Sequence, residues 1–185
     1  MNFQKPLNSY KSKTQPRIQP PSGGGYVLKC LEAIDAPSKA GKPMLTLHFD
    51  IAEGQYLNYY TNGHALFNYV VWPLIARQTY DTDGAISRLK GIFKAFEDSD
   101  VFSSPNEDAT TAFDEQKLTG LAVGASLQEY EYMGKDDEIH TALKIAYLCG
   151  AQKVRLGEIK TLPIIKLQTL PLMSSMDGEV REELF

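Results

Sequence analysis

The stretch LTLHFDI at residues 45–51 alternates strictly between apolar and polar side chains. In an extended chain, such alternation places the apolar side chains on one face and the polar ones on the other. The apolar face holds Leu45, Leu47, Phe49 and Ile51, and the polar face holds Thr46, His48 and Asp50. A period of two is typical of a β-strand with one buried face. The clearest pattern in the chain therefore predicts a β-rich fold.

The sequence on both sides of this stretch also has strand character. An apolar strand is expected at residues 26–34, and a turn at 37–42 containing Pro and Gly joins it to the first stretch. Residues 61–72 are expected to be irregular. Further strands are expected at 75–80, 118–132 and 141–149, the last two joined by a hairpin turn at 134–137.

Two details of the last two strands concern the interior of the fold. Alternation places Leu143, Ile145, Tyr147 and Cys149 on one face of the final strand, so we expect all four to point inward. Gly124 interrupts the preceding strand, which indicates a bulge or a tight bend.

The pattern changes to a helical one between residues 81 and 98. Apolar side chains recur there at the spacing of one helix face, at Ile86, Leu89, Phe93 and Phe96. The order of three strands, a helix and two strands predicts a mainly β protein. It is that of a five-stranded OB-fold-like Greek-key barrel with one helix between strands three and four. Other small α+β folds share this order.

Charge and composition divide the chain into three parts. We expect residues 1–24 to form a flexible, basic N-terminal arm rich in Pro and Gly, residues 25–160 to form the OB-like barrel domain, and residues 161–185 to form an extended segment and an acidic tail. The formal net charge is −4, yet residues 1–42 hold seven Lys or Arg against two acids, and 97–115 hold seven acids and no base. A mildly acidic total disfavours a simple cationic DNA-coating protein but allows a basic face.

No segment indicates a membrane span or a secreted protein. The chain has no apolar run approaching the 18 or so residues of a membrane helix, and its first residues lack the apolar core of a signal peptide. The cysteines, Cys30 and Cys149, are far apart in apolar surroundings. Buried thiols in a reducing compartment, the cytoplasm, are the expectation.

Signals for catalysis are weak. We expect no Cys or carboxylate at metal-ligand spacing from any of the three histidines, His48, His64 and His140. The sequence also contains no nucleotide-binding or hydrolase motif. Asp50 and Glu53 could serve as a metal-binding carboxylate pair, but a strand end and turn held by carboxylate-to-backbone bonds is the favoured alternative. We therefore expect a non-enzymatic protein without cofactor or metal.

The binding signal comes from aromatic residues interleaved with basic ones. Rings that stack on bases and cations that contact phosphates suit single-stranded nucleic acid. The predicted DNA-binding residues are Tyr59, Trp72, Arg77, Tyr80, Tyr130, Tyr132 and Lys144. The competing interpretation is that these rings belong to the core or to cross-strand pairs.

The C-terminal tip joins negative charge to an apolar end. Glu182, Glu183, Leu184 and Phe185 are predicted to bind a basic cleft on a partner protein, as short acidic motifs do. The alternative is an ordinary disordered end.

Several segments resemble one known family. The most specific is Phe-Asp-Ile-Ala-Glu-Gly at residues 49–54; looser matches lie at 21–29, 89–93, 113–124 and 157–159. The sequence resembles the single-stranded DNA-binding proteins encoded in replication modules of phages of Gram-positive bacteria. The resemblance implies an OB-type barrel that coats single-stranded DNA during phage replication or recombination, in the cytoplasm of the infected host.

We also expect phage or host replication and recombination proteins as partners, and the sequence is compatible with a homo-oligomer. Two alternatives remain open. One is a β-rich phage structural or assembly protein that binds no nucleic acid. The other is a metal-dependent nuclease using Asp50 and Glu53.

Overall fold

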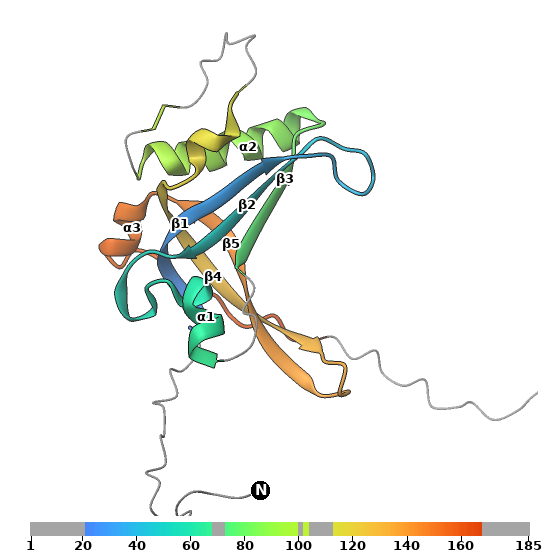
Figure 1. Ribbon diagram of the computed structural model, residues 1–185, viewed down its shortest axis with the longest axis vertical. Coiled ribbons are helices and arrows are strands. Elements are labelled where there is room, and N and C mark those ends of the chain that lie inside the picture. Colours follow the sequence, from blue (N-terminus) through green and yellow to red (C-terminus); the bar gives the residue numbers. More distant parts are fainter. Residues whose placement is uncertain (1–20, 68–72, 100–101, 104–112, 168–185) are drawn as a thin grey trace, which may run out of the picture.

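The computed structural model describes residues 21–67, 73–99, 102–103 and 113–167 (Figure 1). Five strands form the sheet: β1 (Gly24–Asp35), β2 (Met44–Ile51), β3 (Leu74–Thr79), β4 (Ala122–Met133) and β5 (Ile139–Cys149). The helices are α1 (Tyr59–Phe67), α2 (Asp83–Glu97) and α3 (Ala151–Arg155). Two short 3-10 helices are η2 (Gly54–Tyr56) and η3 (Glu115–Leu118).

The strands form one antiparallel sheet that curls into a nearly closed barrel. Their order is β3-β2-β1-β4-β5, so the two outer strands of the sheet, β3 and β5, are brought toward each other. The long helix α2 follows β3 in the chain and lies across one end of the barrel (Figure 1). The predicted mainly β, OB-like barrel with its helix between strands three and four is confirmed.

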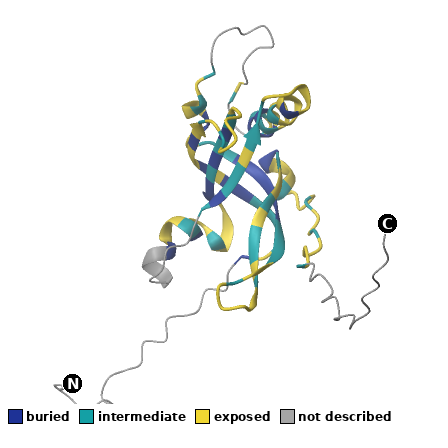
Figure 2. Cartoon of the chain, turned by 90° about the vertical axis from the view of Figure 1, so that its right-hand side faces the viewer, coloured by how far each residue is buried: buried dark blue, intermediate teal, exposed yellow. Residues whose placement is uncertain are grey.

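The core lies where the alternation in the sequence placed it. Leu45, Leu47, Phe49 and Ile51 on β2 are buried, and they face Val123, Ala125 and Leu127 on β4 across the barrel interior. Figure 2 shows the buried residues concentrated on the strands. The ring of Phe96 stacks on that of Phe49, with 6.4 Å between centroids, which fixes α2 to the barrel end.

Helix α2 begins at a side-chain cap. The Thr82 hydroxyl accepts a hydrogen bond from the backbone N–H of Ala85 at 3.2 Å, one of the donors that a helix start leaves unpaired. Phe93 and Phe96 are buried as expected, whereas Ile86 is 41% exposed.

The region expected to be irregular at 61–72 begins with a helix instead. The Asp50 carboxylate accepts hydrogen bonds from the backbone N–H groups of Tyr60 (3.0 Å) and Thr61 (2.7 Å), which caps α1 from a neighbouring strand. A tertiary contact of this kind does not show in the local pattern. Residues 68–72 lie outside the described part of the chain.

The expectation that Tyr147 and Cys149 point inward is wrong. The pairing of β4 with β5 shifts at one point, because Ser126 pairs with Tyr147 whereas Leu127 pairs with Ile145. The extra residue on β5 is a bulge, and it reverses the alternation. Ile145 and Leu148 pack on the core, and Tyr147 is 45% exposed on the outer face.

Gly124 marks a close approach of two backbone segments. A Cβ atom there would lie 2.7 Å from the carbonyl oxygen of Gly150, so only glycine fits. Glycine is therefore required here by the close approach of the residue that follows β5, whereas the bulge in the pairing lies between Ser126 and Leu127.

Beyond the barrel, β4 and β5 continue as a protruding hairpin (Figure 1). The segment 161–167 runs beside β4 there: Ile165 donates its N–H to Glu129 O (3.0 Å) and accepts from Glu131 N–H (2.9 Å). Lys166 adds an ion pair with Glu131 at 2.6 Å. No helix within the described residues is long and apolar enough to cross a membrane.

Candidate nucleic-acid interface

A groove lies where the β3 and β5 edges of the barrel meet α2. Its volume is about 380 Å³, within the size range of ligand sites. Strand β3 supplies Ile75 to Gln78, α2 supplies Arg88, Gly91 and Ile92, and β5 supplies Ile145 to Leu148. The groove therefore joins three elements that are far apart in the sequence.

The groove combines positive charge with an exposed ring. Arg77 and Arg88 both line it, and no acidic side chain stands among its described lining residues. Within the described part of the chain, neither guanidinium has an ion-pair partner, so both can bind an anion. The bulge on β5 brings the Tyr147 ring to the same groove.

A second strip of side chains continues from the groove along the protruding hairpin. Residues directly opposite each other in an antiparallel pair project from the same face. The pairs Gln128–Lys144, Tyr130–Ala142 and Tyr132–His140 therefore share the outer face of β4 and β5.

The rings of this hairpin strip lie close together. The centroid of the Tyr132 ring is 6.0 Å from that of Tyr130 and 5.7 Å from that of His140, and Tyr132 is 42% exposed. Lys144 immediately precedes the β5 residues that line the groove. The fold thus brings three predicted residues, Tyr130, Tyr132 and Lys144, onto one face of the hairpin. Arg77, also predicted, lies on β3 on the other side of the groove.

The remaining predicted DNA-binding residues lie elsewhere. Tyr59 is only 8% exposed and packs edge-to-face on Tyr56 and Tyr60 at the start of α1, which makes it a core side chain. Trp72 and the C-terminal residues, Glu182, Glu183, Leu184 and Phe185, lie outside the described residues.

Tyr80 lies on the other side of α2 from the groove. Its hydroxyl donates a hydrogen bond to the Asp35 carboxylate at 2.5 Å. This bond, together with partial burial and the charges of Asp35 and Glu115, raises the pKa of Tyr80 to about 12. A ring held among carboxylates is in a poor position to meet phosphate groups.

Two residues of the groove were missed by sequence reasoning. Arg88 gave no separate signal because exposed arginines are common on helices, and only the fold shows that β3 places Arg77 opposite it. Strict alternation predicts Tyr147 in the interior, because a bulge has no local signature in this strand.

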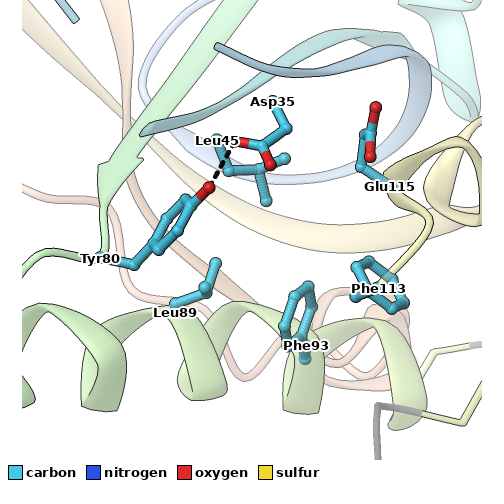
Figure 3. Close-up of a pocket in the computed structure, with 7 residues that line it drawn as sticks. All are labelled: Asp35, Leu45, Tyr80, Leu89, Phe93, Phe113 and Glu115. Carbon is cyan, nitrogen blue, oxygen red and sulfur yellow. Dashed lines mark hydrogen bonds between the residues drawn. The ribbon is translucent and has the colours of Figure 1, made fainter. Parts of the chain in front are cut away.

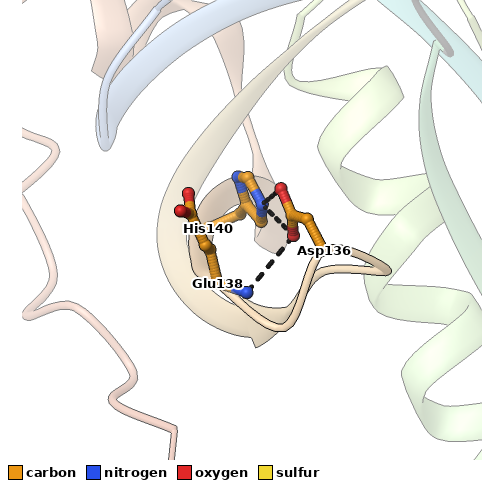
Figure 4. Close-up of side chains that lie close together, drawn as sticks. All are labelled: Asp136, Glu138 and His140. Atoms are coloured by element: carbon orange, nitrogen blue, oxygen red, sulfur yellow. Dashed lines mark hydrogen bonds and ion pairs between the residues drawn. The ribbon is translucent and has the colours of Figure 1, made fainter.

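The turn of the β4–β5 hairpin brings three possible ligand groups together (Figure 4). The ligand atoms of Asp136, Glu138 and His140 all lie within 4.8 Å of one another. His140 Nε2 is 2.8 Å from Asp136 Oδ1, and this contact lowers the pKa of Asp136. The expectation that no carboxylate stands at ligand spacing from a histidine is therefore wrong. The contact between the exposed side chains of Asp136 and His140 closes the hairpin turn.

The suggested carboxylate pair has two separate roles. Asp50 is buried, at 1% exposure, and its oxygens accept the backbone N–H groups of Ile51, Tyr60 and Thr61. Glu53 instead forms an ion pair with Arg155 at 2.7 Å. Asp50 thus makes the carboxylate-to-backbone bonds that the alternative interpretation described, whereas Glu53 pairs with a side chain instead.

The sequence matches no protein-family model and no curated protein.

Proposed function

We propose that this protein is a non-enzymatic single-stranded DNA-binding protein whose strand runs along the β3–β5 groove and the outer face of the β4–β5 hairpin. The observation that carries the proposal is the groove itself, where two unpaired arginines and an exposed tyrosine meet without an acidic neighbour among the described lining residues. An OB-like barrel is a frequent carrier of such sites.

The chemistry of this surface favours a single strand over a duplex. Phosphates pair with the guanidinium groups of Arg77 and Arg88, and unpaired bases stack on the rings of Tyr147, Tyr132 and Tyr130. In a duplex the base faces are already stacked on one another, so the rings gain nothing. Only the salt-dependent phosphate contacts would remain.

The biological setting of the proposal is phage DNA replication or recombination in the cytoplasm of the infected bacterium. Its support is the sequence resemblance at residues 49–54 and the flanking segments. Phage or host replication proteins would be recruited through the acidic tip at 182–185.

One observation favours a second candidate, a β-rich structural or assembly protein. Met133 and Ile139 are exposed next to the turn of the protruding hairpin, where a contact with another protein would bury them. Such a protein would self-associate through the hairpin and would bind no nucleic acid.

A polarisation titration of the full chain with labelled oligo-dT, oligo-rU and duplex DNA at two salt concentrations tests the proposal. We expect the tightest binding to a single strand and weaker binding at the higher salt concentration. Equal affinity for duplex and oligo-dT, or no binding at low salt, would contradict it. Self-association without DNA binding would support the assembly protein instead.

A further inference from the structure

A second hollow lies on the opposite flank of α2 (Figure 3). It has a volume of about 320 Å³. Its walls come from the end of β1, from β2, from α2 and from the residues just before and at the start of η3. It is lined by Asp35, Leu45, Tyr80, Leu89, Phe93, Phe113 and Glu115.

This pocket has an apolar floor and an acidic rim. Leu89, Phe93 and Phe113 form much of the floor, and the carboxylates of Asp35 and Glu115 stand at the edge. No basic side chain is among its described lining residues. Both carboxylates contribute to the raised pKa of Tyr80, which supports a negative potential over the opening.

The chemistry of the pocket selects its ligand. A phosphate would be repelled by the two carboxylates, and a purely apolar group would leave them without a counter-ion. The matching group is a cation on an apolar stem, which is the chemistry of a lysine or arginine side chain beside apolar residues. The Tyr80 hydroxyl occupies one side of Asp35, which leaves acceptor capacity on that carboxylate for an ammonium or guanidinium group.

The chain carries a segment with this chemistry. Residues 1–20 contain four basic residues and no acid, interspersed with Phe3, Leu7, Tyr10 and Ile18. Phe113 and Glu115 of the pocket belong to the most acidic stretch of the sequence, 97–115, which has seven acids and no base. Charge complementarity therefore links the first twenty residues to this pocket rather than to the arginine groove.

The length of the segment is sufficient to reach the pocket. The segment enters the barrel near Gly24, at the start of β1, and the pocket begins at Asp35, where β1 ends. Twelve strand residues span about 40 Å, whereas twenty extended residues reach at most about 70 Å. Covalent attachment also supplies an effective concentration of about the millimolar range.

We propose that residues 1–20 dock on their own barrel by placing a lysine side chain between Asp35 and Glu115. The inference is independent of DNA binding, because it rests on the pocket alone. Docking holds basic charge on the pocket side of α2.

Carbodiimide cross-linking of the full chain tests the contact without DNA. This reagent joins a carboxylate to an amine that touches it. We expect cross-links from Lys5, Lys11 or Lys13 to Asp35 or Glu115 in monomeric protein, and their loss at about 1 M salt, where charges are screened beyond about 3 Å. Cross-links spread evenly over exposed acids, or present only in covalent dimers, would overturn docking on the same chain.

Limited trypsin digestion provides a second test with a matched control. Docking should slow cleavage after Lys11, Lys13 and Arg17 by about threefold, the protection expected when the effective concentration is about twice the dissociation constant. The double variant Asp35→Asn, Glu115→Gln should lose this protection. The equally charged control Asp136→Asn, Glu138→Gln, at the hairpin turn, should keep it. Equal cleavage rates in all three proteins would overturn the proposal.

Discussion

The two flanks of α2 differ in charge although their residues alternate along one helix. Arg88 and Ile92 line the groove beside β3 and β5, whereas Leu89 and Phe93 line the pocket beside the end of β1. The helix itself does not set the difference. Strand β3 adds Arg77 to one side, and Asp35 stands on the other.

This contrast shows why the charge of a segment is a poor guide to its partner. Two neighbouring helix residues, Arg88 and Leu89, belong to sites that favour ions of opposite sign. The electrostatic potential at each flank of α2 depends on which strand the fold places against that flank. The predicted consequence is that anionic DNA and cationic segments use different sides of the same helix.

The largest expected effect is that of charge reversal in the groove. Each guanidinium-to-phosphate hydrogen bond contributes about 1.5 kcal/mol or more, so Arg77→Glu with Arg88→Glu should weaken binding to oligo-dT by about 100-fold or more. The control Lys39→Glu with Lys117→Glu makes the same change of charge away from the groove and should change affinity by less than about threefold. A similar loss of affinity in both double variants would mean that the effect comes from the net charge of the protein and not from the groove.

Removal of a single ring should have the next largest effect. Tyr147→Ala should cost about 1–3 kcal/mol of single-strand affinity, because one stacking platform is lost. Tyr80→Ala, which removes a ring on the pocket side, should leave the affinity unchanged. Titrations at one salt concentration, with melting curves to confirm folding, compare the two. Equal losses, or a loss only at Tyr80, would reverse the assignment of the two flanks.

The smallest expected effect is on stability at the pocket. The Tyr80–Asp35 hydrogen bond is partly exposed, so Tyr80→Phe should cost only about 0.5 kcal/mol, or about 1–2 °C in Tm. Because the folded pKa of Tyr80 is raised from 10.0 to about 12, this contribution is fully present below pH 10. It should then disappear as the pH rises toward 12.

Thermal melts of the native chain and of Tyr80→Phe between pH 8 and about 11.5 measure this linkage. The difference in Tm should be constant at the low end and shrink at the high end. A difference that grows with pH would mean that Tyr80 is stabilised as the phenolate, against the contacts seen in the pocket.

The sequence was sufficient for most of the barrel. Alternation at 45–51 and helical spacing at 81–98 depend on burial of one face, and the fold keeps both patterns. The features that the sequence could not predict depend on contacts between residues that are far apart in the chain. The cap that Asp50 provides for α1 and the bulge that turns Tyr147 outward both require the partner strand or helix to be in place.

The same limit applies to the candidate interface. The mixture of aromatic and basic residues directed attention to Arg77, Lys144, Tyr130 and Tyr132, which the fold places on one side. The sequence pattern could not separate these residues from Tyr80, which is also an aromatic residue close to a basic one in the sequence. A carboxylate forty-five positions away in the chain, Asp35, decides the surroundings of that ring.

The salt dependence of oligo-dT binding tests the central claim most directly. For a single strand, the slope of log K against log salt changes by about 0.7 for each phosphate that a cation neutralises. If Arg77 and Arg88 each neutralise one phosphate, the variant Arg77→Ala, Arg88→Ala should have a slope shallower by about 1.4 than the native chain. Identical slopes in the two proteins would mean that the groove does not hold the strand.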